Sequence, residues 1–280
     1  MSTSDQPGRA AMVSRDGTRI DYERRGSGPA LVLVHGGFVD RSFWGPSLPL
    51  LANYYTVYAM DRRGHGQSDP YPADHDIERE YEDVAAMVAA VGAPVAVLGH
   101  SGGARVALHA ARRADQVRQL VLYEPPRFDA ITPAVRARLH ASLEAGDLDD
   151  ILATFLVDVI AADMNPELFP SARPQVLAGM RESPIWAAAL RNVQSIPAEA
   201  DSYATYRFEP TEFRDFSTPT VLLLGGTSSA VMRGFVEDLH AALPISRIMV
   251  LEGQGHGAML EAPELFVRTV RAALEWASDL

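Results

Sequence analysis

The chain has no cysteine, and its 280 residues carry 25 arginines and no lysine against 36 aspartates and glutamates. The absence of cysteine excludes disulfides, thiolate catalysis and cysteine–zinc sites. The net charge of −11 argues against nucleic acid or an anionic membrane as the main partner. No run of about 18 apolar residues is present, so we expect no membrane-spanning segment.

Residues 1–10 are polar and lack the apolar stretch of a secretion signal. We expect them to form a flexible tail on a cytoplasmic protein whose partner is a small molecule. No histidine–carboxylate spacing favours a metal, and the glycines at 99–103 lack the lysine and the spacing of a phosphate-binding loop. The sequence therefore indicates no metal or cofactor, and it leaves the oligomeric state open.

Apolar runs alternate with helix-like segments over most of the chain, which predicts a mostly parallel sheet covered by helices on both faces. The expected strands are 30–34, 55–60, 95–98, 119–123, 220–224 and 246–251. The expected helices are 42–53, 76–91, 102–113, 230–242 and 262–277. A hairpin is expected at the start, over 11–15 and 19–25.

The alternation stops between residues 125 and 216, where only helix-like segments occur. We predict an α/β core of residues 11–124 and 217–280, with 125–216 inserted as a helical cap over the strand ends. The expected cap helices are 133–145, 148–162, 167–182 and 185–195. Large apolar side chains of this segment either line a substrate cavity or only seal the cap onto the sheet; they include Phe155, Leu156, Phe169, Ile185 and Trp186.

The most informative motif is Gly99-His100-Ser101-Gly102-Gly103, which follows an apolar strand and precedes a helix. Small residues on both sides of the serine allow the sharp strand-to-helix turn that exposes a nucleophilic hydroxyl. A serine nucleophile needs a base, and His256 follows the last expected strand with glycine on either side. Both loops lie at the same edge of a parallel sheet, so His256 is the candidate base.

Four motifs in this order resemble the α/β-hydrolase superfamily over nearly the whole chain: His35–Phe38, Asp61–Ser68, Gly99–Gly103 and Gly255-His256. The resemblance implies the eight-stranded α/β-hydrolase fold with Ser101 as nucleophile and His256 as base. It also implies an oxyanion hole formed by the backbone N–H groups of Gly102 and of Gly37 or Phe38.

The resemblance assigns other residues of these motifs to structural roles. Asp61 and Arg63 are expected to hold loops together, and His65 and His100 to be positional. An aspartate in place of Ser101, which a dehalogenase or epoxide hydrolase of this fold would need, is absent.

The third member of a catalytic triad departs from the commonest family pattern. The loop 225–233 contains no carboxylate, although most relatives carry an aspartate there. Glu124 ends the strand before the cap, on the serine edge of the sheet, and some superfamily branches take their acid from that position. We expect Glu124 to orient His256. A Ser–His dyad, another carboxylate, or a salt bridge from Glu124 to Arg127 or Arg207 are the alternatives.

These residues predict serine-dependent hydrolysis of small to medium, largely apolar esters, lactones or thioesters through an acyl-enzyme. The same fold also supports lyases and cofactor-free oxygenases, in which His256 would abstract a proton from the substrate. A ligand-binding receptor is the third alternative, since such members can retain the triad.

Overall fold

The protein, described here by a computed structural model, contains one eight-stranded sheet in the order β1-β2-β4-β3-β5-β6-β7-β8. The structure describes residues 8–72, 75–127, 131–161, 177–182 and 184–279. All strands from β3 onward pair in parallel, whereas β2 pairs antiparallel with β1 and β4. The strands are Gly8–Val13, Arg19–Arg25, Ala30–Val34, Thr56–Met60, Val95–His100, Val117–Tyr123, Thr220–Gly225 and Ser246–Leu251, numbered β1 to β8.

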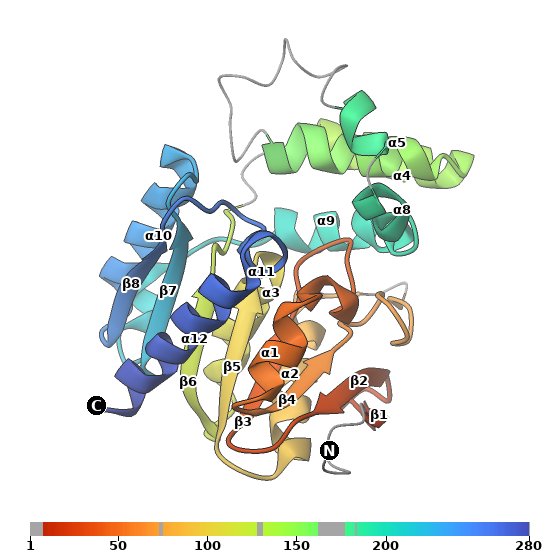
Figure 1. Ribbon diagram of the computed structural model, residues 1–280. Coiled ribbons are helices and arrows are strands. Elements are labelled where there is room, and N and C mark those ends of the chain that lie inside the picture. The colour runs from red at the N-terminus through yellow and green to blue at the C-terminus, as the bar shows by residue number, and fades with distance from the viewer. Residues whose placement is uncertain (1–7, 73–74, 128–130, 162–176, 183, 280) are drawn as a thin grey trace.

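Helices cover both faces of this sheet (Figure 1). Alternate residues of the central strands face opposite sides: Leu31 and Leu33 of β3 pack with one apolar cluster, and Val32 and Val34 with the other. The first cluster contains residues of α1 (Ser47–Ala52), α11 (Ala258–Glu261) and α12 (Pro263–Ser278). The second contains residues of α2 (Ile77–Val91), α3 (Gly102–Ala111) and α10 (Ala230–Ala242).

Several expected element boundaries need correction. The expected tail 1–10 is wrong at its end, because Gly8–Val13 form β1 and pair with β2 over the full length of the strand. The expected helix 42–53 is interrupted at Gly45, which has a φ of 43° and precedes Pro46. The expected helix 262–277 is preceded by the short α11. The hairpin and the helix from residue 77 are confirmed.

Helices connect β6 to β7, and Figure 1 shows α4, α5 and α8 lying together beyond one end of the sheet. We refer to residues 125–216 as the helical insertion. The helices described in it include α4 (Pro133–Ala145), α5 (Leu148–Thr154), the π-helix Phe155–Ala161, α8 (Pro184–Ala189) and α9 (Ile196–Ala204). The expected helix 133–145 is confirmed to the residue. Most of the expected helix 167–182 lies outside the described residues.

The helix α9 is not among the helices expected from the sequence, the last of which in the insertion ends at residue 195, shortly before Pro197. Proline is favoured in the first turn of a helix, where its missing N–H would have no intrahelical partner. Pro197 occupies this first turn, and α9 continues to Ala204.

The turn between β5 and α3 brings two backbones closer than a side chain permits. A Cβ atom at Gly103 would lie 2.2 Å from the carbonyl oxygen of His35 and 2.5 Å from that of Val34. A Cβ atom at Gly99 would lie 2.5 Å from the Cα of Ala104. The glycines therefore allow α3 to pack directly on the end of β3, which fixes the position of Ser101.

We expect Gly103→Ala to lower the free energy of unfolding by about 3 kcal/mol, because the clash is with backbone that must shift. The matched control is Gly234→Ala in α10, where a Cβ would meet nothing within 4 Å. That change should be neutral or stabilise by up to about 1 kcal/mol. Urea unfolding of both variants measures the difference; equal stabilities would contradict the packing argument.

Candidate active site

Three neighbouring strands lead into residues with unusual backbone geometry. Phe38, Ser101 and Glu124 follow β3, β5 and β6 and have φ values of 49°, 53° and 45°. They are the non-glycine residues with positive φ in the described part of the chain. Such conformations each cost about 1–3 kcal/mol and concentrate at functional sites. All three are residues that the sequence placed in the candidate site.

Ser101 stands at a turn that both flanking elements hold. Its backbone N–H donates to the carbonyl of Tyr123 at 2.9 Å, and α3 begins at the next residue. The Ser101 backbone angles of 53° and −128° are neither helical nor extended. Small neighbours permit this turn: a Cβ atom at Gly36 would lie 3.1 Å from the Cβ of Ser101.

His256 and Glu124 are joined by a short hydrogen bond. Nδ1 of His256 donates to Oε2 of Glu124 at 2.7 Å, and the Glu124 side chain is fully buried. The expected alternative partners are engaged elsewhere: Arg127 pairs with Asp238, and Arg207 donates to the carbonyls of Ala204 and Tyr206. The Glu124 carboxylate, at the end of β6, is thus the hydrogen-bond partner of the His256 Nδ1 atom.

The other carboxylate oxygen of Glu124 is held by the loop after β7. The backbone N–H of Gly225 donates to Oε1 at 2.7 Å, and the Ser228 hydroxyl donates to the same oxygen. Burial raises the pKa of Glu124, but the hydrogen bonds from His256, Ser228 and Gly225 outweigh it, so the pKa lies below its usual value. The loop 225–233, which contains no carboxylate, thus supplies hydrogen-bond donors to Glu124 at the end of the neighbouring strand β6.

His100 places the His256 ring beside the serine turn. The two imidazole centroids lie 4.4 Å apart, and Nε2 of His100 donates to the His256 carbonyl at 3.0 Å. Burial holds the pKa of His100 well below its ordinary value, so this histidine is neutral. His100 is thus positional, and it is the residue directly before Ser101.

The loop after β3, which carries Gly37 and Phe38, is anchored by His35. Nδ1 of His35 donates to the Gly36 carbonyl at 2.7 Å, and its Nε2 accepts from the backbone N–H of Arg62 at 3.0 Å. Complete burial lowers the pKa of His35, so the ring stays neutral and keeps one donor and one acceptor.

Asp61 and Arg63 hold loops together. Asp61 accepts from the side chain and backbone of Arg41, at 2.8 Å each, and from the backbone of Gln67. Arg63 forms a two-point contact with Asp83 at 2.6 and 2.7 Å. The structural roles expected from the sequence match these contacts.

A buried group of charged and polar side chains, which we call the Arg62 cluster, joins the core to the helical insertion. It comprises Arg62, Glu80 of α2, and Glu199 and Tyr203 of α9, each at most 3 % exposed. Arg62 contacts Glu80 at 2.6 Å and Glu199 at 2.7 Å, both through Nη2. The Tyr203 hydroxyl donates to Oε1 of Glu199 at 2.7 Å.

Sequence reasoning missed the Arg62 cluster. Arg62 is adjacent to the expected Arg63, and only the position of α9 shows that it has partners 137 residues away in the chain. Among the expected apolar residues of the insertion, Phe155 packs edge-to-face on Phe38 with centroids 5.7 Å apart. Leu156 and Trp186 are buried. Phe169 and the side chain of Ile185 lie outside the described residues.

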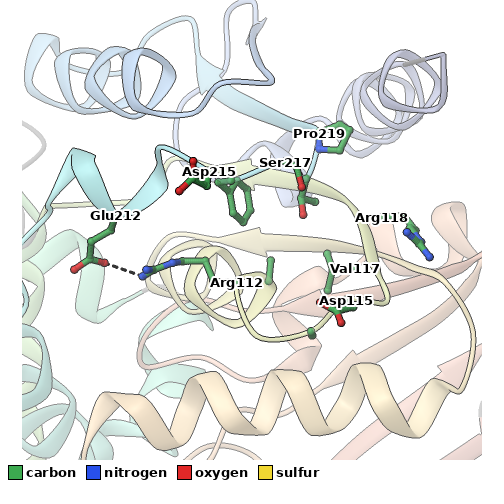
Figure 2. Close-up of a pocket in the computed structure, with 12 residues that line it drawn as sticks. Arg112, Asp115, Val117, Arg118, Glu212, Asp215, Ser217 and Pro219 are labelled. Carbon is green, nitrogen blue, oxygen red and sulfur yellow. Dashed lines mark hydrogen bonds and ion pairs between the residues drawn. The ribbon is translucent and has the colours of Figure 1, made fainter.

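The cavity drawn in Figure 2 lies away from these residues. It has a volume of about 510 Å³ and is lined by the C-terminal end of α3, the start of β6 and residues 215–219. Ser101 and Glu124 flank the opposite ends of the same helix and strand. Ten helical residues span about 15 Å, so this cavity is separate from the candidate site.

Comparison with known proteins agrees with the motifs and the fold. A profile of the alpha/beta hydrolase family matches residues 31–269. The chain belongs to the alpha/beta hydrolase family.

Two relatives of this alpha/beta hydrolase have defined activities. A 2-(acetamidomethylene)succinate hydrolase from Mesorhizobium japonicum is 25% identical, with 90% of each chain covered. A pimeloyl-[acyl-carrier protein] methyl ester esterase from Aeromonas hydrophila is 29% identical over 90% of this chain and 97% of the esterase. A crystal structure of an alpha/beta hydrolase from Sphaerobacter thermophilus superposes with a TM-score of 0.82, at 30% identity, covering 95% of this chain and all of that one. The chain is accordingly a hydrolase of the alpha/beta type.

In its described part, no helix is both long and apolar enough to cross a membrane.

The Arg62 cluster generates a prediction about acid stability. Burial raises the pKa of Glu80, but the attraction of Arg62 and a contact with His75 lower it to about 2, from 4.5. Because the folded-state pKa is the lower one, this stabilisation is present above pH 4.5 and is lost as the pH falls toward 2. Glu80→Gln should therefore destabilise by about 3 kcal/mol at neutral pH, and by progressively less below pH 4.5.

Urea unfolding at a series of pH values measures this effect. The control is Glu82→Gln on the same helix, because Glu82 pairs with Arg15, whose side chain is 83 % exposed, and such pairs contribute little. A constant difference between wild type and Glu80→Gln across the acid range would contradict the prediction.

Proposed function

We propose that this alpha/beta hydrolase cleaves small to medium esters, lactones or thioesters through a covalent acyl-enzyme. In the proposal, Ser101 is the nucleophile, His256 the base and Glu124 the acid that orients His256. The observation that carries it is the 2.7 Å hydrogen bond from His256 to fully buried Glu124, beside the strained turn at Ser101. The named activities of the two relatives, both hydrolases, agree with it.

The proposed reaction has two half-reactions. His256 takes the proton from the Ser101 hydroxyl as its oxygen attacks the substrate carbonyl, and returns that proton to the leaving alcohol or thiol. Water then attacks the acyl carbonyl as His256 takes its proton. The return of that proton to the Ser101 oxygen, as the acyl C–O bond breaks, releases the carboxylic acid and restores the serine. The backbone N–H groups of Gly102 and of Gly37 or Phe38 stabilise the oxyanion, and because backbone fixes them, they need no reorganisation. Ionised Glu124 stabilises the imidazolium that forms in both steps.

The helical insertion acts in this proposal as the cap over the acyl group. Phe155 of the insertion packs on Phe38 of the loop after β3, so apolar side chains border the proposed oxyanion hole. Apolar acyl chains bury favourably on such a surface. We also propose a cytoplasmic location, as the composition suggested.

The first test is Ser101→Ala, which should abolish the burst of nitrophenol from p-nitrophenyl butyrate and lower kcat by about 10³-fold or more. A fluorophosphonate probe should label wild type and not the variant. His256→Ala should lose turnover to a similar extent. Turnover that survives Ser101→Ala but not His256→Ala would overturn the acyl-enzyme and favour proton abstraction by His256.

The second test is Glu124→Gln, which keeps the shape of the side chain but removes the charge that stabilises imidazolium. We expect kcat to fall by about 10³-fold with little change in KM. Glu237→Gln in α10 is the matched control and should leave kcat unchanged. Near-full activity of Glu124→Gln would assign the role to a Ser–His dyad or another carboxylate.

A further inference from the structure

The glycines of the proposed oxyanion hole are covered by side chains of α9. A Cβ atom at Gly37 would lie 3.0 Å from Oε2 of Glu199, and one at Gly102 would lie 2.4 Å from the Tyr203 hydroxyl. Arg62 also approaches, with Nη1 at 3.7 Å from that Gly102 position. Polar groups therefore occupy the space that side chains at these two positions would fill.

Two atoms of these side chains have no hydrogen-bond partner among the described residues. They are Nη1 of Arg62 and Oε2 of Glu199, both buried. Arg62 and Glu199 contact each other through Nη2 and Oε1. This contact leaves Nη1 of Arg62 as a donor and Oε2 of Glu199 as an acceptor without a partner in the described part of the chain. Nε2 of His65 lies 3.8 Å from Oε2, beyond hydrogen-bond distance. Burial lowers the pKa of that histidine, so the ring is neutral and does not compensate the charge of Glu199. Buried polar atoms are rarely left unpaired.

The charge of the cluster restricts what can pair with these atoms. One guanidinium faces two carboxyl groups, those of Glu80 and Glu199. An anionic group would meet an excess of acceptor oxygens and be repelled. An uncharged group that both accepts and donates would satisfy Arg62 and Glu199 together, and an amide has this combination.

We propose that Arg62 and Glu199 form a polar subsite beside Gly37 and Gly102, which binds an uncharged donor–acceptor group of the acyl chain, such as an amide, close to the scissile carbonyl. The inference rests on the proposed function, because it takes Gly37 and Gly102 as the oxyanion hole. The Arg62–Glu199 subsite is polar, whereas the Phe38–Phe155 contact is apolar. The subsite therefore discriminates between acyl groups that apolar side chains alone would bind equally well.

Three ethyl esters with acyl chains of equal length test the subsite: N-acetylglycinate, levulinate and pentanoate. The amide nitrogen of the first is a methylene in the second, and the third has no polar atom in its chain. We expect kcat/KM of wild type to be about tenfold higher for the amide than for the ketone ester, and lowest for monoethyl succinate, which carries a carboxylate. Equal values for the three uncharged esters would overturn the proposal.

Glu199→Asp retains the charge and withdraws the acceptor by one methylene, so it should lower the amide-to-ketone ratio about tenfold. Glu199→Gln is the second variant if the first does not fold. Glu212→Gln, whose exposed carboxylate pairs with Arg112 beside the cavity of Figure 2, should keep the wild-type ratio. A purely structural role for Glu199 would lower the melting temperature or all rates equally and leave the ratio unchanged, which would overturn the proposal.

A binding experiment separates the two proposals. Calorimetric titration of Ser101→Ala, with and without Glu199→Asp, measures the amide and ketone esters as ligands without turnover. If Ser101→Ala binds the amide ester more tightly than the ketone ester, and Glu199→Asp removes this difference, the subsite is supported even if Ser101 is not the nucleophile. Failure of wild type to hydrolyse ethyl pentanoate would count against the proposed function alone.

Discussion

Three strained turns at one edge of a parallel sheet determine the arrangement of the site. Phe38, Ser101 and Glu124 each have a positive φ that non-glycine residues rarely adopt. The strands before them, β3, β5 and β6, are adjacent, and their hydrogen-bonded register fixes the distances between the turns. The surrounding core must hold these conformations against their intrinsic cost of about 1–3 kcal/mol each. The buried strands and the glycine contacts of α3 provide that support.

In the proposed triad, the acid follows β6, and the loop after β7 supplies its hydrogen-bond donors. Glu124 extends β6, and its backbone N–H still donates to the carbonyl of Leu223 in β7 at 3.1 Å. The side chain then turns toward the loop after β7, where Gly225 and Ser228 donate to one oxygen and leave the other for His256. A buried carboxylate needs several donors to stay ionised. Small and hydroxylated residues in that loop meet this need without an acid of their own.

Much of this arrangement could be predicted from sequence, because the relevant signals are local. The strand–turn–helix around Ser101 is marked by glycines within five residues, and the strand before Glu124 ends visibly at two prolines. The Arg62 cluster could not be predicted in the same way. Its members come from a loop, from α2 and from α9, and the first-turn proline of α9 resembles a helix break. Contacts between segments this far apart depend on how the helical insertion packs on the core. A local sequence motif does not predict that packing.

The Arg62 cluster also explains why the helical insertion and the core cannot be considered separately. Gly37 and Gly102 have no side chains, so groups of α9 form the surface beside them. These groups are positioned by Arg62, which depends in turn on Glu80 of the core helix α2. Burying these charges is favourable only while each keeps its partner. A change in any member therefore alters the fit of α9 against the two glycines, so the geometry of the proposed oxyanion hole and the choice of acyl group rest on one set of contacts.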